Sequence, residues 1–360
     1  MELENIINEQ LDSMDLSQLQ ELMNGVSRDG TLFSGMSVGD ILMSLVRGES
    51  LFTWDEVIHA LSSLFFAQVQ ASLTFAIEVF AICILIGILS NISSSFSENA
   101  ASQLGSLVCG LVITVLCMRD FLNVYNLCAD SVTLMVRAMQ VILPILVPLL
   151  IAMGGVTAGS VMNPVIMGAI AILSTVILSF ILPAVFVSSV FFLINSLSEK
   201  DYIKKLAKFL RTAAVFITGL AITIFSGLTS IQGVVTKSAD GMLMKTAQFS
   251  IDNFIPIIGG FAADSMDLIL SCTAIIKNGI GVAGLLIISG LMLLPLVKLL
   301  ATALIYKVLA VALEPVSGRR ISDCIDEMGN AVVTLLVILI LTGILFFIFL
   351  AILISVGRTV

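Results

Sequence analysis

The chain contains a series of apolar runs that are each about long enough to cross a lipid bilayer. A helix needs roughly 20 mainly apolar residues to cross the ~30 Å hydrocarbon core. Of the 360 residues, 58% are hydrophobic and only 12% are charged, whereas a soluble domain is typically about 25% charged. The mean hydropathy is +1.13. So many apolar side chains need lipid as their solvent, and the sequence therefore predicts an all-α, polytopic integral membrane protein.

The apolar runs predict about seven to nine transmembrane or re-entrant helices. They cover residues 66–90, 104–122, 138–158, 161–182, 183–197, 210–232, 254–276, 279–305 and 331–356. As one helix, residues 161–197 would be ~55 Å long, which is too long for a single crossing, so we expect a break near Pro183. The run 254–276 contains two aspartates and two adjacent glycines, which favours a segment that enters the membrane and returns.

The first 65 residues form an acidic region that precedes the membrane domain at 66–360. They hold eleven acidic residues against two basic ones, a net charge of −9. We expect short helices here: one after Ser37, and one from Trp54 that continues into the first span. Thr53 and Glu56 have the spacing of a capping box, which is a strong helix-start signal. Two interpretations of the region stay open, an amphipathic bundle that rests on the membrane and a docking surface.

Basic residues set the expected orientation, because loops on the cytoplasmic side are enriched in Lys and Arg. The densest cluster is Lys200, Lys204, Lys205, Lys208 and Arg211. This loop should be cytoplasmic, and counting back through five crossings places the acidic region outside the cytoplasm. The loop at 306–330 contains Lys307, Arg319 and Arg320, so it should also be cytoplasmic. Both loops meet the rule only if 254–276 does not cross the membrane.

Charged residues inside the apolar runs are candidate structural or pore-lining sites, because each costs roughly 2.5–3.5 kcal/mol at the centre of a membrane helix. Glu78 lies in the first run, Asp264 and Asp267 in the run 254–276, and Lys298 in the run 279–305. Glu78 and Lys298 are interpreted as an opposite-charge pair across helices, with a pore-lining or proton-relay role and snorkelling as alternatives. The candidate hinge consists of Pro256, Gly259 and Gly260.

The segment 233–253 is too polar and too interrupted to cross lipid, yet it has one apolar face. One interpretation is an interfacial helix that anchors the loop. The other is that this helix and the run 254–276 line or gate a conduit, with Asp264 and Asp267 facing water.

The motifs of common enzyme classes are missing from the sequence. His59 is the only histidine, which excludes the HExxH motif and a histidine-rich metal site. The sequence also has no phosphate-binding G-x-x-x-x-G-K-[ST] loop and no G-x-S-x-G. The net charge of −8 argues against binding to nucleic acid. We therefore expect no enzyme activity, no catalytic or metal-binding residues and no cofactor.

A set of short motifs resembles the stage III sporulation protein AE family of endospore-forming bacteria. The most specific is the block from Thr236 to Pro256, and the others are Phe209-Leu210-Arg211, Ser230-Ile231-Gln232-Gly233, a Lys277-Asn278-Gly279 turn and Ile305-Tyr306-Lys307. The similarity extends from about residue 50 to the end of the chain. Family members normally begin with a secretory signal peptide, which is not visible in this sequence.

The resemblance implies a component of the channel complex built between mother cell and forespore after engulfment. The implied partners are other proteins of the stage III sporulation A operon, including an ATPase and ring-forming proteins, and indirectly the forespore-side stage II sporulation protein Q. The implied location is the mother-cell membrane around the forespore. No catalytic residues are assigned in the family, so none is carried over.

Two hypotheses of function therefore remain. The leading one is a non-enzymatic membrane subunit of a specialised secretion or channel complex. The alternative is a stand-alone secondary transporter or permease, with a site at Glu78, Asp264, Asp267 or Lys298. A weak internal similarity between residues 130–155 and 240–260 favours the alternative, because many transporter folds contain repeats.

Overall fold

The computed structural model describes residues 16–29, 36–47, 49, 51–95, 100–153, 155, 163–197, 201–254, 259–317 and 319–355, and in this part the regular elements are all helices. The helices are α2 (Ser17–Asp29), α3 (Val38–Arg47), α4 (Trp54–Ser95), α5 (Ala100–Ala152), α6 (Asn163–Val176), the π-helix η2 (Ile177–Ile181), α7 (Leu182–Leu197), α8 (Lys204–Phe254), α9 (Gly259–Ser317) and α10 (Arg319–Ser355). The predicted all-α class is confirmed.

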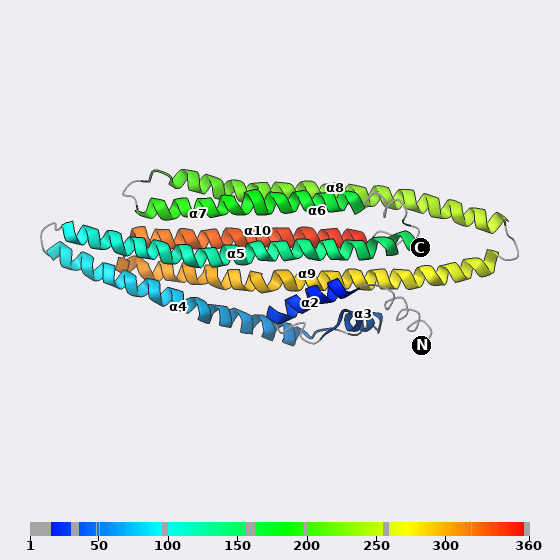
Figure 1. Cartoon of the computed structure of the whole chain (residues 1–360), viewed down its shortest axis with the longest axis horizontal. Helices are drawn as coiled ribbons and strands as arrows, with labels where there is room; N and C mark the ends of the chain where they lie inside the picture. The colour runs from blue at the N-terminus through cyan, green and yellow to red at the C-terminus, as the bar shows by residue number, and fades with distance from the viewer. Residues whose placement is uncertain are drawn as a thin grey trace.

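Six long rods run alternately in opposite directions: α4, α5, the continuous run α6–η2–α7, α8, α9 and α10 (Figure 1). The turns α4–α5, α7–α8 and α9–α10 lie at one end of the bundle, on the left of Figure 1. Each rod contains a stretch that is long and apolar enough to cross a membrane. These stretches are Trp54–Leu85, Gly110–Ala152, Pro164–Leu197, Lys204–Ile231, Leu270–Val316 and Arg320–Ser355.

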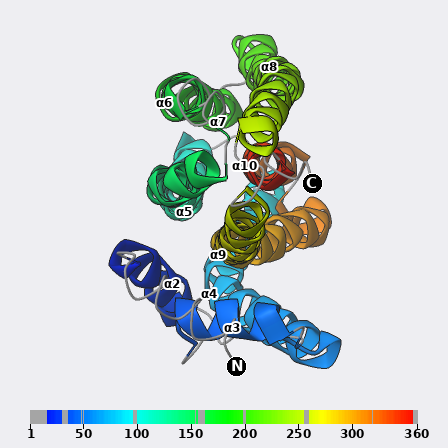
Figure 2. The same cartoon turned by 90° about the vertical axis from the view of Figure 1, so that its right-hand side faces the viewer.

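The rod α9 lies at the centre of the bundle. It packs against α10, α4 and α5, and the view along the bundle shows it between α4 and α10 (Figure 2). The head helices α2 and α3 also pack on α9. They lie toward the end opposite the α9–α10 turn, where the chain's last helix also ends (Figure 1).

Capping boxes start the two helices that the sequence analysis expected in the acidic region. Thr53 N–H donates to Glu56 Oε2 at 3.0 Å, and Glu56 N–H donates to Thr53 Oγ1 at 3.4 Å. At the start of α3, Asp40 N–H donates to Ser37 Oγ at 3.0 Å, and Ser37 N–H donates to Asp40 Oδ2 at 2.9 Å. Each box satisfies backbone donors that a helix start leaves open. Both predicted helix starts are confirmed.

Two expected interruptions of the helices are replaced by continuous helix. The separate runs 104–122 and 138–158 lie in the single helix α5, which contains Pro144 and Pro148. Near Pro183 the helix does not end but widens into the π-segment Ile177–Ile181. A proline ring clashes with the carbonyl four residues before it, here that of Ser179, and a π-turn is a common way to accommodate such a misfit. The predicted break near Pro183 is therefore wrong.

The predicted boundary between the runs 254–276 and 279–305 is also wrong. Residues 259–317 form one helix, so Lys277-Asn278-Gly279 is a helical segment and no turn. Over these residues α9 does not reverse its direction, as a re-entrant segment would. One uninterrupted rod therefore brings the basic start of α8 and the α9–α10 turn to the same end of the bundle (Figure 1). The sequence analysis counted two separate segments, 254–276 and 279–305, where the structure has one helix. With one crossing fewer, both basic loops can lie on the same side of the membrane.

The segment 233–253 is the continuation of α8. Together with the first part of α9 it forms a helical hairpin that reaches beyond the other rods, on the right of Figure 1. The interfacial and conduit-lining interpretations of 233–253 both stay predictions, because the side chains of this segment lie outside the described part of the structure.

Three glycines allow α9 to pack closely against α10 and α5. A side chain at Gly281 of α9 would collide with Ile354 of α10, and one at Gly343 of α10 would collide with Met292 of α9. A Cβ atom at Gly284 would lie 3.0 Å from Ile142 of α5. The sequence pattern Gly281-x-x-Gly284 therefore does thin α9 for close packing.

Candidate functional site

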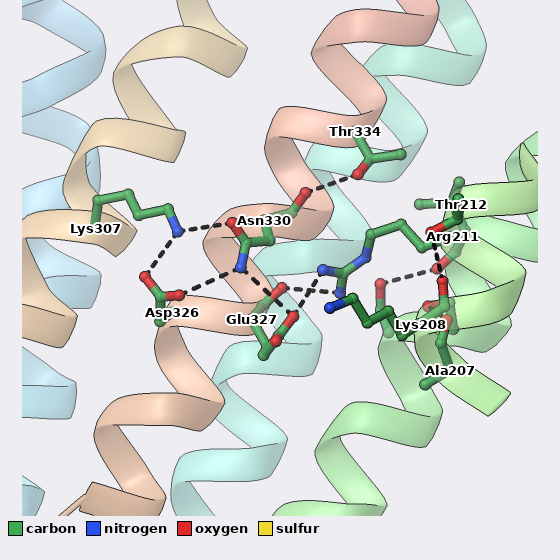
Figure 3. Close-up of polar contacts among 12 residues, drawn as sticks. Ala207, Lys208, Arg211, Thr212, Lys307, Asp326, Glu327, Asn330 and Thr334 are labelled. Carbon is green, nitrogen blue, oxygen red and sulfur yellow. Dashed lines mark hydrogen bonds and ion pairs between the residues drawn. The ribbon is translucent and has the colours of Figure 1, made fainter. Parts of the chain in front are cut away.

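A largely buried ion pair connects α8 to α10. Arg211 Nη1 lies 2.7 Å from Glu327 Oε2, and Arg211 Nη2 donates to the backbone carbonyl of Glu327 at 3.1 Å. The two side chains are 12% and 26% exposed. The guanidinium carbon also lies 4.4 Å from the ring centroid of Phe192 in α7, a cation–π contact. One side chain thus contacts two neighbouring helices, and Figure 3 shows its contact with Glu327.

Lys307 of α9 joins the same group of contacts. Its Nζ atom lies 2.7 Å from Asp326 Oδ1 and donates to Asn330 Oδ1 at 2.7 Å. The Asn330 amide nitrogen in turn donates to Asp326 Oδ2 at 3.3 Å and Glu327 Oε2 at 3.5 Å. Figure 3 shows Asn330 between the two ion pairs. The contacts join α8, α9 and α10, and the two cations balance the two carboxylates.

The residue before Lys307 extends the contacts to α5. The Tyr306 hydroxyl donates to Asp120 Oδ2 at 2.8 Å, and Tyr306 is fully buried. Its ring centroid lies 5.3 Å from that of Phe75 in α4. We call Asp120, Arg211, Tyr306, Lys307, Asp326, Glu327 and Asn330 the polar layer. Four rods meet in it through hydrogen bonds and ion pairs.

Two adjoining cavities open beside the polar layer. The larger, of about 210 Å³, lies between α4, α5 and α9, and the smaller, of about 180 Å³, lies between α4 and α5. Both are lined by Asp120 and Asn123. We call the two together the polar crevice; its polar lining includes Gln68, Glu78, Arg119, Asp120, Asn123 and Lys298. In the described ranges, no three His, Cys, Asp or Glu side chains are grouped so as to hold a metal ion.

Glu78 and Lys298 both line the polar crevice but do not pair with each other. Lys298 lines the larger cavity and Glu78 the smaller one, and the ion pairs of the described residues do not include them. The side chain of α4 that reaches α9 at this level is Gln68, whose amide lies 3.4 Å from Thr302 Oγ1. Glu78 is ten residues, or roughly 15 Å, further along α4. The predicted direct pair is wrong.

The remaining candidates lie at the start of α9. Gly259 is its first residue and Gly260 its second, while Pro256 lies outside the described residues. Asp264 and Asp267 lie within the first turns of α9, and their side chains are outside the described part. The hinge and the water-facing aspartates therefore stay predictions.

The sequence analysis missed the members of the polar layer as site residues. Arg211, Tyr306 and Lys307 stood in the family-like motifs, but they were assigned no role. Lys277, in another such motif, is buried and donates to the Ile354 carbonyl at 2.9 Å, close to the C-terminal end of α10, where a cation is favourable. The usable signal was a charged or hydrogen-bonding side chain at a family-like motif position in or next to an apolar run.

Six apolar rods joined by charged and polar contacts define a polytopic α-helical membrane protein. The chain belongs to the Stage III sporulation protein AE family, whose profile matches residues 36–357. It is 26% identical over 347 residues to Stage III sporulation protein AE of Bacillus subtilis (strain 168), covering 96% of this chain and 87% of the relative. No solved structure gives a significant match. The chain is thus a sporulation-related membrane protein.

Proposed function

We propose that the chain is a non-enzymatic membrane subunit of a specialised secretion or channel complex that connects mother cell and forespore during endospore formation. Its partners are other proteins of the stage III sporulation A operon, including an ATPase and ring-forming proteins, and indirectly stage II sporulation protein Q. Family membership supports a role in sporulation.

The observation that carries the proposal is the pair of elements at one end of the bundle. The acidic head helices and the extended α8–α9 hairpin both lie away from the basic turns (Figure 1). The hairpin reaches beyond the other rods (Figure 1), and its segment 233–253 is too polar and too interrupted to cross lipid. Both elements are suited to contacts with partners outside the bilayer, which a stand-alone transporter does not need.

The proposed orientation follows from the same asymmetry. The basic turns lie in the cytoplasm by the positive-inside rule, and the head and the hairpin lie outside it, in the mother-cell membrane that surrounds the forespore. In a background without native cysteines, a cysteine at Ser37 should react with an impermeant reagent in intact cells. A cysteine at Tyr202, which is 74% exposed, should react only after permeabilisation. The reverse pattern would contradict the orientation.

Affinity purification from sporulating cells tests the partners. The full chain should recover the other stage III proteins, and a variant in which residues 236–262 are replaced by a short Gly/Ser linker should lose them while still accumulating in the membrane. A matched control replaces the exposed Lys205 with Gln and should keep the partners. Unchanged recovery with the shortened hairpin would contradict its docking role.

A second candidate function is a stand-alone secondary transporter, and the polar crevice favours it. Its charges lie between helices of the bundle, where transporter sites are often found. A transporter should be stabilised by its substrate in the absence of partners and should keep its activity when the hairpin is shortened. Neither result is expected of a complex subunit.

A further inference from the structure

Three charged side chains of the polar crevice have no partner among the residues that the structure describes. Glu78, Arg119 and Lys298 line it, and their charged groups form no hydrogen bond or ion pair with the other residues that the structure describes. All three lie within apolar stretches of their helices. Because an isolated charge is costly inside a membrane, something polar must meet these groups.

The polar layer shows how deep the crevice lies. Its contacts run from Asp120 in the crevice through α9 and α10 to Arg211, seven residues from the start of α8, in the segment that carries the exposed Lys205 and Lys208. Exposed lysines of this kind belong at the level of lipid head groups rather than among acyl chains. The crevice therefore lies at head-group depth, on the side of the basic turns.

The spacing of the two lysines within α9 gives the same depth independently. Lys277 and Lys298 are twenty-one residues apart, or about 30 Å of helix, which equals the thickness of the hydrocarbon core. The acyl-chain region therefore lies between these levels, and Lys298 lies at its edge.

The crevice opens to the outside of the bundle between α4 and α5. Its lining residues Glu78, Arg119 and Asn123 are exposed there. Aliphatic side chains flank the opening on both helices, with Ile77 66% exposed on α4 and Val115 65% exposed on α5. A polar hollow with an apolar rim, open at head-group depth, fits an amphiphile whose head enters the hollow and whose chains lie along the rim.

The charges of the crevice define the head group. Arg119 and the Asn123 amide can donate to a phosphate, and Glu78 together with Asp120 can accept from an ammonium group. All four side chains line the smaller cavity, and a cation beside two carboxylates matches a zwitterion. A choline head has no N–H to donate, and a glycerol head has hydroxyl donors but no positive charge to balance the carboxylates. We propose that the polar crevice binds a phospholipid with a phosphoethanolamine head group.

The test is lipid retention by the purified full-length chain in nanodiscs of equal phosphatidylethanolamine, phosphatidylglycerol and phosphatidylcholine content, followed by native mass spectrometry. The wild type should retain phosphatidylethanolamine about tenfold over the other two lipids. Arg119→Gln and Glu78→Gln should each lower this preference at least severalfold. Lys205→Gln, which removes an exposed lysine outside the crevice, should leave it unchanged.

Three outcomes would overturn the proposal in different ways. Equal retention of the three lipids means that the crevice holds only water. Preference for phosphatidylglycerol means that the carboxylates do not select the head group. If soluble glycerophosphoethanolamine displaces the lipid at equal concentration, the head-group chemistry stands but the membrane is not its source. Each measurement uses the chain without partners, so it does not depend on the proposed complex.

Discussion

The two ends of the apolar part of α9 bind their neighbours in different ways. Gly281 and Gly284 have no side chains, so side chains of α10 and α5 pack directly against the backbone of α9 there. Around Tyr306 and Lys307 the contacts are directed hydrogen bonds and ion pairs to α5 and α10. In lipid, helices gain little from burying apolar surface against each other, so close packing and polar contacts must hold them together. The packing around Gly281 and Gly284, which we call the glycine segment, depends on side-chain volume. The contacts of the polar layer depend on charge and hydrogen-bond geometry.

The largest effect should come from the polar layer. Glu327→Ala leaves the Arg211 guanidinium buried without its carboxylate, and Arg211 Nε is already without a partner among the described residues. We expect a loss of about 3 kcal/mol, seen as a lower thermal midpoint in detergent and lower accumulation in cells.

The double variant Arg211→Met with Glu327→Leu is the control for this prediction. Removing both charges avoids the unpaired cation, so the double variant should recover much of the lost stability. Simple additivity of the two single changes would show that the pair contributes nothing as a unit.

The next effect should come from the glycine segment. Gly281→Leu forces a side chain into Ile354, and overpacking of this kind typically costs about 1–3 kcal/mol. Gly227→Leu on α8 is the matched control, because nothing lies within 4 Å of a Cβ atom built there. Thermal unfolding should separate the two variants. Equal midpoints would mean that α9 and α10 can move apart without cost.

A smaller effect is expected for the second ion pair of the polar layer. Lys307 and Asp326 are 39% and 44% exposed, so water screens their attraction. Lys307→Met should cost about 1 kcal/mol or less, clearly below the cost of Glu327→Ala in the same assay. A larger loss would place Lys307, rather than Arg211, at the centre of the polar layer.

The smallest effect concerns the acidic head and depends on pH. Hydrogen bonds from Ser37 hold the pKa of Asp40 below its ordinary value of 3.8. The cap is therefore fully present above that ordinary value and is lost as the pH falls through the lowered pKa. Hydrogen exchange at the start of α3 should accelerate only in this acidic range, and Ser37→Ala should weaken the pH dependence, since only the bond from the Ser37 backbone N–H to Asp40 is left.

Local signals in the sequence were sufficient for the helix starts and for the thin face of α9. The capping spacing of Thr53 and Glu56 and the spacing of Gly281 and Gly284 each act within one or two helical turns. The continuity of the helix at Pro183 was not predictable in this way. A proline breaks or merely bends a membrane helix according to what surrounds it, and those neighbours come from distant parts of the chain.

The polar contacts failed as predictions for a related reason. The Glu78–Lys298 pair was chosen because the two charges are opposite and both lie in apolar runs. Which charges meet depends on how far each helix is shifted along its neighbour, and a shift of ten residues moved Glu78 into a different cavity. A single sequence contains no direct record of that shift.

The even number of rods has a practical consequence. Because the six rods alternate in direction, the head helices and the end of α10 lie at the same end of the bundle (Figure 1). Two halves of a split fluorescent reporter, one fused before α2 and one after α10, would therefore be delivered to the same compartment. They should assemble within a single molecule.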